Sequence, residues 1–265
     1  MSGSTWFAVW VVCCATLITG LPTVTDDTNE FALNWLRFYG YLYSSEADDE
    51  LSIADVSAAI RRMQAFASLP ETGVVDSATL EVMNMPRCGV PDFEPDEDGQ
   101  FKRYTTGSKW PRTALTYKFE SYTRDLSVGN IKSTVAASFK QWSDVCPLTF
   151  TLVTGTADII IKFVEGWHGD GNAFDGMSGI LAHAFYPASG FGGDLHYDDA
   201  ETFRMHSTNS NDIDLLYVTV HEIGHSIGIG HSSVSGAIMY PTYAKVATVK
   251  LHSDDINAAR AQYGK

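Results

Sequence analysis

Three histidines in the C-terminal part of the chain have the spacing of a catalytic zinc site. Residues 221–231 read HEIGHSIGIGH, in which His221 and His225 stand four residues apart in an apolar stretch. A helix places residues at this spacing on one face, so both imidazoles can reach one zinc ion. Gly228 allows the chain to leave the helix sharply and bring His231 round as a third ligand. Three histidines leave one tetrahedral position open, as in a catalytic rather than a structural site.

Glu222 supplies the remaining group that hydrolysis at such a site needs. It follows the first histidine directly, so its carboxylate can take a proton from a water molecule that zinc has acidified. Such a site needs no serine or cysteine nucleophile. Met239 follows eight residues after His231, and HExxHxxGxxH with a later methionine is the metzincin signature. The sequence therefore predicts a zinc-dependent endopeptidase with Met239 as the floor of the zinc site.

Two of the four cysteines lie outside the apolar N-terminal stretch and are expected in the folded chain. Cys13 and Cys14 fall in an apolar N-terminal stretch, which leaves Cys88 and Cys146. These two could form a disulfide in an oxidising compartment. Against this, Cys88 stands in PRCGVPD, where flanking Pro and Gly favour a thiol presented to another group.

The elements that must position these residues alternate between strands and helices. Strands are predicted at 115–119, 149–152 and 159–164, and helices at 128–143, 215–227 and 254–263. A Gly- and Asp-rich region, 166–199, interrupts this order and holds short strands near Leu181 and Leu195. Strand–helix–strand order implies a largely parallel α/β sheet. Upstream, a small helical unit is predicted: an amphipathic stripe indicates a helix at 53–67, a stretch rich in Trp and Phe indicates one at 31–42, and Asp76 as N-cap indicates one at 77–83.

The N-terminus and the net charge limit where the protein acts and what it binds. Residues 6–18 are apolar and uncharged, too short for the ~20 residues of a membrane span, and fit a secretory signal peptide better. The 32 acidic residues against 18 basic ones argue against nucleic acid as a partner. Part of the acidic excess could bind calcium, although a solvated acidic surface explains it equally well.

Together these motifs resemble the matrix metalloproteinase family, from about residue 31 to the end of the chain. Ser232 directly after the third histidine is typical of that branch, and PRCGVPD resembles its cysteine switch. The resemblance implies a metzincin catalytic domain, with a twisted, mostly parallel five-stranded sheet and three helices, after a three-helix prodomain. It divides the chain into a signal peptide (1–20), a prodomain (21–100) and a catalytic domain (101–265). It also implies that Cys88 fills the fourth zinc position in the latent form.

Further metal sites follow from the same resemblance. A second, structural zinc would be bound by His168, Asp170, His183 and His196, which makes two zinc ions in all. Two or three calcium ions are implied. One calcium site would use Asp175, Gly176, Ser178, Ile180, Asp198 and Glu201; another Asp158, Gly190, Gly192 and Asp194; a third Asp125, Asp199 and Glu201.

The resemblance also implies how substrates bind. A peptide would lie antiparallel to residues 181–185, with a specificity pocket formed by His221 and by Tyr217, Val218, Pro241 and Tyr243. A tyrosine at 217 predicts a shallow-to-medium pocket that prefers leucine or methionine. The layout is similar to minimal, matrilysin-type members without a hemopexin domain, which favours matrix, gelatin or casein-like substrates over native collagen. We expect a secreted monomer without a membrane anchor, regulated by endogenous metalloprotease inhibitors.

Activation and two alternative functions complete the expectations. The mature N-terminus is placed near Phe101, where its ammonium would pair with Asp254, or at Tyr104 after the Lys102-Arg103 site. A catalytically silent binder of the same fold is one alternative, but zinc binding alone does not require Glu222. An astacin-like enzyme is the other, and the switch motif and Ser232 argue against it.

Overall fold

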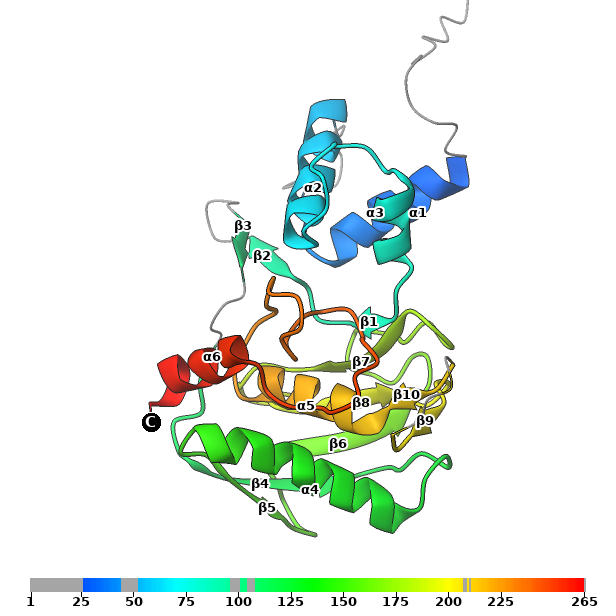
Figure 1. Ribbon diagram of the computed structural model, residues 1–265. Coiled ribbons are helices and arrows are strands. Elements are labelled where there is room, and N and C mark those ends of the chain that lie inside the picture. The colour runs from blue at the N-terminus through cyan, green and yellow to red at the C-terminus, as the bar shows by residue number, and fades with distance from the viewer. Residues whose placement is uncertain are drawn as a thin grey trace, which may run out of the picture.

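The computed structural model describes residues 26–43, 52–95, 101–103, 108–206, 209 and 211–264. Figure 1 shows a helical unit stacked on a larger α/β unit. The expected signal peptide and the alternative start at Tyr104 lie outside the described residues. Among the helices described, none is both long and apolar enough to span a bilayer.

The helical unit consists of three helices around a core of its own. These are α1 (Asp26–Phe38), α2 (Ile53–Phe66) and α3 (Ser77–Met83). Ser52 caps α2 in a capping box with Asp55, and Asp76 caps α3. The core is aromatic and aliphatic and includes Trp35, Leu36, Tyr41, Met63 and Phe66.

The first helix ends earlier than the predicted range of 31–42. Gly40 adopts a φ of 79°, and a Cβ atom at this position would lie 2.0 Å from the carbonyl oxygen of Phe93. Only glycine fits this left-handed, crowded turn, so the helix stops at Phe38. The apolar side chains of residues 39–42 are buried from a turn rather than from another helical turn.

The larger unit contains a six-stranded sheet with the order β1-β7-β8-β6-β4-β5. Its strands are β1 (Arg87–Cys88), β4 (Ala114–Phe119), β5 (Thr149–Leu152), β6 (Ile159–Val164), β7 (Ile180–Ala184) and β8 (Leu195–Asp198). All neighbours pair in parallel except β7 and β8. The five expected strands are thus joined by a sixth, β1, which belongs to residues 86–92, the PRCGVPD motif, called here the switch segment. The predicted α/β class is confirmed.

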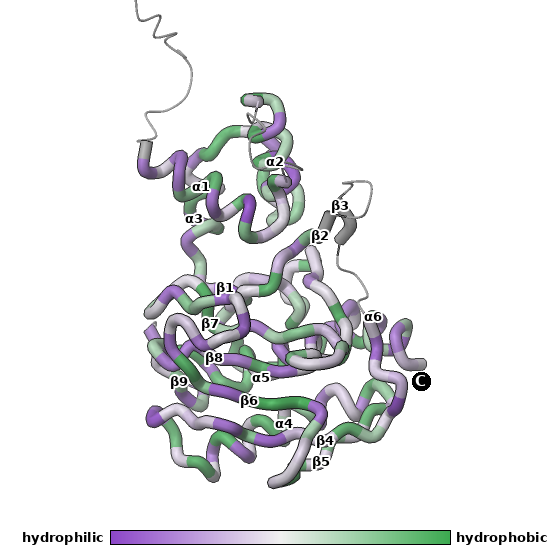
Figure 2. The backbone as a smooth tube through the Cα atoms, turned by 180° about the vertical axis from the view of Figure 1, so that it is seen from behind, coloured by the Kyte–Doolittle hydropathy of each residue, from purple (hydrophilic) through white to green (hydrophobic). Residues whose placement is uncertain are grey.

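Two long helices cover one face of this sheet. They are α4 (Val128–Val145) and α5 (Leu215–Ser226), and Figures 1 and 2 show them on the same side of the strands. The apolar strand β6 lies centrally and packs with them in the main core. The remaining elements are α6 (Ser253–Tyr263), the pair β2 (Phe93–Pro95) and β3 (Phe101–Arg103), and the pair β9 (Phe203–Arg204) and β10 (Ile213–Asp214).

Candidate active site

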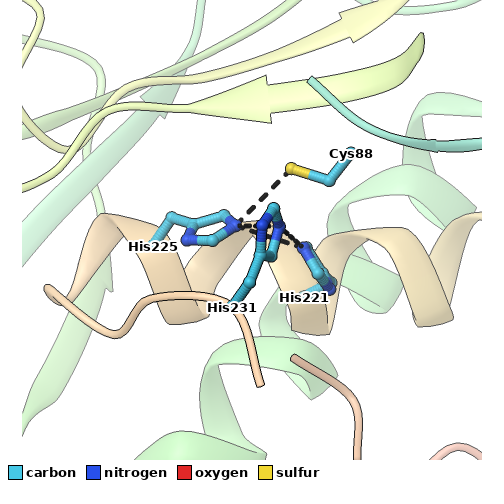
Figure 3. A group of neighbouring side chains, drawn as sticks. All are labelled: Cys88, His221, His225 and His231. Carbon is cyan, nitrogen blue, oxygen red and sulfur yellow. Dashed lines mark hydrogen bonds between the residues drawn. The ribbon is translucent and has the colours of Figure 1, made fainter. Parts of the chain in front are cut away.

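Helix α5 carries the first two histidines of the predicted zinc site into the interior. Nearly every residue of α5 is buried, and Asp214 caps its first turn. Gly228 has a φ of 89°, so the chain reverses after the helix and returns with His231. The Nε2 atoms of His221, His225 and His231 lie 3.1–3.2 Å apart and point at one another (Figure 3). Three neutral imidazoles converging in this way form a metal site.

The outer nitrogen of each ring contacts an oxygen. Nδ1 of His221 lies 2.7 Å from the carbonyl oxygen of Ile238, and Nδ1 of His225 lies 2.8 Å from that of Ile229. These contacts fix the tautomer in which Nε2 is free to bind a metal. The outer nitrogen of His231 differs, because it lies 2.7 Å from a carboxylate oxygen of Asp92.

Cys88 enters the same space from the switch segment. Its Sγ atom lies 3.5 Å from Nε2 of His225 and 3.7 Å from Oε2 of Glu222. The thiol and the three histidines offer four donor atoms, all within 4.8 Å of one another. Neither Cys88 nor Cys146 forms a disulfide, so the disulfide alternative is excluded in this structure.

Burial sets the protonation of these groups. It raises the pKa of Glu222 to about 8 and lowers that of His221 to about 3. Burial also raises the pKa of the Cys88 thiol, and the nearby Glu222 acts in the same direction. Without a cation the pocket favours neutral side chains. The neutral imidazoles keep nitrogen lone pairs available, so the site favours binding of a divalent cation. The donor set therefore fits zinc.

The floor of the site is the turn that contains Met239. Met239 is buried, and its backbone N–H and that of Ile238 donate to the carboxylate of Asp255 at 3.0 and 2.9 Å. A Cβ atom on Gly224 would lie 2.2 Å from the sulfur of Met239, so α5 rests directly on this side chain. Helix α6 thus fixes the turn, and the turn supports α5.

A second cluster joins the four residues expected to bind the structural zinc. One oxygen of Asp170 lies 2.7 Å from Nε2 of His168, 2.8 Å from Nε2 of His183 and 2.7 Å from Nδ1 of His196. Within the described ranges, this cluster and the Cys88 cluster are the two groups whose donor atoms converge. Three histidines and one carboxylate with no base beside them suit a closed structural site.

The expected calcium ligands do not converge in this way, although several lie close together. Asp198 accepts from the N–H of Gly176, and Glu201 from that of Ser178. Ser178 has a φ of 71°, a conformation that L-residues adopt at a cost and that the Glu201 contact holds. Asp175 accepts from the N–H of Ile180 within the same loop.

The other expected calcium ligands form two separate groups, one with Asp158 and Asp194 and one with Asp125 and Asp199. Asp158 accepts from both the N–H and the hydroxyl of Thr116, while Asp194 accepts from the N–H of Ile160. Gly190 and Gly192 lie in the loop before Asp194. Near Phe203, whose N–H donates to Asp125, a buried oxygen of Asp199 has no protein partner among the described residues. An orphaned carboxylate oxygen of this kind fits a cation.

A small pocket adjoins the three histidines at the N-terminal end of β7. Its volume is about 10 Å³, and its lining is formed by Cys88, Leu181, Tyr217, Val218, His221, Glu222, Pro241 and Tyr243. The ring of Tyr217 meets that of Tyr243 edge to face at a centroid distance of 5.1 Å. The expected pocket residues are thus side by side, with the switch thiol among them.

Comparison with known proteins places this geometry in a family. Residues 109–264 match the family described as Matrixin. The chain belongs to the matrixin family. Residues 32–83 of this matrixin match a second family, described as "Putative peptidoglycan binding domain". The resemblance drawn from the sequence motifs is confirmed.

Individual relatives are similar along nearly the whole matrixin chain. It is 41% identical to interstitial collagenase of Bos taurus, over 92% of this chain and 52% of the relative. It is 40% identical to matrix metalloproteinase-18 of Xenopus laevis, over 95% and 54%. It is 39% identical to matrilysin of Homo sapiens, over 96% of both chains. The chain thus spans about half the length of interstitial collagenase and of matrix metalloproteinase-18, and nearly all of matrilysin.

Several residues that shape the matrixin site were not singled out from the sequence. Asp92 contacts His231, and the hydroxyl of Tyr41 donates to the other oxygen of Asp92 at 2.7 Å. Asp255 holds the turn of Met239. The place of Asp92 in PRCGVPD was a signal that could have been followed. Tyr41 and Asp255 carry no such signal, because their partners are distant in sequence.

Proposed function

We propose that this matrixin is a zinc-dependent endopeptidase, made as a zymogen that Cys88 keeps latent. The observation that carries the proposal is the grouping of Glu222 and the Cys88 thiol around three converging histidines. A purely structural zinc site would not require a carboxylate that is not a ligand. The family membership supports the same reading.

Glu222 would act as general base and then as general acid. Zinc held by the three histidines supplies a Lewis acid for the scissile carbonyl and lowers the pKa of water toward ~7. Glu222 takes the proton of the attacking water and returns it to the leaving amine. Burial raises the pKa of Glu222 to about 8 in the closed site, and a bound dication would lower it, so that the carboxylate can accept the proton.

The latent form follows from the position of the thiol. Cys88 reaches the side of the histidines where water and substrate must enter, and β1 lies along β7 in parallel. A thiolate binds zinc strongly, so it excludes the water that hydrolysis needs. Removal of the prodomain (21–100) from the catalytic domain (101–265) would expose both the metal and the edge of β7.

Substrate would then take the place of β1 on β7, but in the antiparallel direction, which gives the stronger ladder. The side chain after the cut would enter the pocket beside Tyr217, where leucine or methionine fits best. The names of the relatives, interstitial collagenase and matrilysin, favour matrix proteins as substrates. Gelatin and casein-like proteins are suitable unfolded substrates, and metalloprotease inhibitors are expected partners of a monomer.

Further metal ions would stabilise the catalytic domain. We assign a second zinc to the cluster around Asp170, whose oxygen is within 2.8 Å of three imidazole nitrogens. Two or three calcium ions would bind the carboxylates around Asp198, Asp194 and Asp199. Raised carboxyl pKa values at all three, caused chiefly by burial, support cation binding.

Secretion and cleavage complete the proposal. Residues 1–20 would direct export as a signal peptide. A mature chain starting at Phe101, rather than at the alternative Tyr104, would bring its ammonium to Asp254, which lines a cavity of about 360 Å³ and now accepts from the hydroxyl of Ser232. The new terminus would compete with Ser232 for this carboxylate.

Casein cleavage by the purified zymogen tests the function. An organomercurial, which modifies the Cys88 thiol, should start cleavage, and a zinc chelator should stop it. The variant Glu222→Gln should lose about 10²–10⁴-fold in turnover, the usual range for a general base. Activity that survives the chelator or the substitution would refute the proposal. N-terminal sequencing of the activated form locates its start.

A further inference from the structure

The outer contacts of the three histidines come from two different parts of the chain. His221 and His225 take theirs from the carbonyl oxygens of Ile238 and Ile229, which belong to the catalytic domain. His231 takes its contact from Asp92, four residues after the switch cysteine. Nδ1 of His231 meets the geometric criteria of a hydrogen bond with none of the residues described, so its 2.7 Å approach to Asp92 is an ion-pair contact. One of three ligands therefore depends on a segment that activation removes.

Asp92 is held firmly in this position. Its side chain is fully buried, the guanidinium of Arg87 donates to one carboxylate oxygen at 2.7 Å, and the hydroxyl of Tyr41 donates to the other at 2.7 Å. Arg87 in turn lies over the ring of Tyr39, with 3.4 Å between its Cζ atom and the ring centroid. The carboxylate thus connects the core of the helical unit to a zinc ligand.

A carboxylate behind a histidine ligand has a known physical effect on a metal. It orients the ring and makes the coordinating nitrogen more basic, and losing such a partner typically costs about 10–100-fold in metal affinity. Carbonyl oxygens also orient the ring and raise the basicity of the coordinating nitrogen, but more weakly, since they carry no full charge. The contact of Asp92 should therefore matter most among the three.

We propose that Asp92 is a positioning residue for His231 and tightens zinc binding in the zymogen, independently of the Cys88 thiol. This inference rests on the proposed function, since it takes the three histidines to bind zinc. Activation then removes two groups from the metal centre: the thiol in front of zinc and the carboxylate behind one ligand. The zymogen holds zinc more tightly than the mature enzyme for both reasons.

Zinc transfer to a chromogenic chelator tests the proposal. All proteins carry Glu222→Gln, so that none can cleave itself, and Cys88→Ser, so that the thiol has no part. Adding Asp92→Asn to this background should increase the zinc dissociation constant by about 10–100-fold. The zinc dissociation constant should then equal that of a Glu222→Gln catalytic domain from which the prodomain has been removed.

A second substitution keeps the test decisive if Asp92→Asn fails to fold. Tyr41→Phe removes one hydrogen bond to the carboxylate and leaves Arg87 paired, so zinc should bind more weakly by a smaller factor. Tyr43→Phe, a neighbouring and half-exposed tyrosine, is the matched control and should leave zinc binding unchanged. Thermal unfolding of the zinc-free proteins separates loss of the fold from loss of the contact.

Equal zinc affinity with and without Asp92, or with and without the Tyr41 hydroxyl, would overturn the inference. So would a weakening by Asp92→Asn that is seen in an additional Glu222→Gln pair retaining Cys88 but is absent from the Cys88→Ser pair, since Asp92 would then act only through the thiol. These results leave the proposed function intact. A wild-type zymogen that contains no zinc at the three histidines would instead refute the proposed function itself.

Discussion

At the scale of single residues, the active site is a set of groups that burial keeps neutral until a cation binds. Burial raises the pKa of Glu222 and lowers that of His221. The sulfur of Cys88 lies 3.7 Å from a carboxylate oxygen of Glu222. Such a set of neutral donor groups is suited to bind a divalent cation. The proposed substrate specificity would depend on a further residue, Tyr217, which lines the adjoining pocket.

Replacing Tyr217 by leucine should enlarge this pocket. The tyrosine ring packs against Tyr243 and limits the depth available to the side chain after the cut. In activated Tyr217→Leu, kcat/KM for substrates with a large side chain there should rise about 10-fold or more relative to leucine substrates. Peptides that differ only at this position measure the ratio, and an unchanged ratio would show that Tyr217 does not set the depth.

The proposed calcium ligands predict a dependence of stability on pH. Burial raises the pKa of Glu201 to about 7 and that of Asp194 to about 6. These carboxyls bind protons more tightly in the folded than in the unfolded chain, where their pKa is about 4. Without calcium, their contribution to stability is therefore lost as pH rises from about 4 through the folded pKa values.

Thermal unfolding with and without calcium measures this dependence. In a calcium-selective chelator the unfolding temperature should fall between pH 5 and pH 8, and calcium should restore it most at pH 8, where it replaces the missing protons. Glu201→Gln should reduce the difference. A calcium effect equally large at pH 5 and pH 8 would contradict the assignment.

At the scale of elements, α5 is positioned by a stack of contacts beneath it. Gly224 lies on Met239 and near Trp142, whose indole N–H donates to the carbonyl oxygen of Val220 at 2.9 Å. Asp255 on α6 holds the turn of Met239 from the other side. The zinc ligands therefore depend on close packing between α5, the turn and α6.

A methyl group at Gly224 should disturb this stack. Its Cβ would lie 2.2 Å from Sδ of Met239 and 3.1 Å from Trp142, both fully buried. Gly224→Ala should cost about 1–3 kcal/mol in the free energy of unfolding, as overpacking does. Denaturant unfolding measures this, and it should be accompanied by weaker zinc retention.

Gly129→Ala is the matched control for this substitution. Gly129 lies in the first turn of α4, and its nearest atom to an added Cβ is 3.9 Å away. Alanine there should stabilise the protein by up to about 1 kcal/mol, because it favours the helix. If both variants lose similar stability, the packing account of Gly224 is wrong.

The sequence predicted most of these elements but not their distant contacts. Apolar periodicity predicted α2 closely, the N-cap at Asp76 predicted α3, and a continuous apolar run predicted the strand β6. The motif spacing indicated which histidines would meet. The prediction misplaced the end of α1, because the turn at Gly40 depends on Phe93, more than fifty residues away. It also did not foresee Tyr41 beside Asp92, since nothing local to Tyr41 indicates a partner 51 residues away.

At the scale of the whole molecule, two separate hydrophobic cores are joined by one short segment and by a ring contact. The helical unit has its own buried cluster, and the switch segment joins it to the catalytic sheet through β1 and the Arg87–Asp92 ion pair. Phe66 of the helical unit also stacks on Tyr240 near the active site. The proposed latency would thus depend on both units together rather than on either unit alone.

Casein cleavage by the uncleaved chain tests the central claim most directly, that Cys88 closes a zinc site whose base is Glu222. Cys88→Ser should be active without an organomercurial, because a hydroxyl binds zinc far more weakly than a thiolate. Cys146→Ser, which replaces the other buried thiol, should stay latent. Cys88→Ser/Glu222→Gln should lose about 10²–10⁴-fold relative to Cys88→Ser. A latent Cys88→Ser zymogen, or an active double variant, would contradict the account.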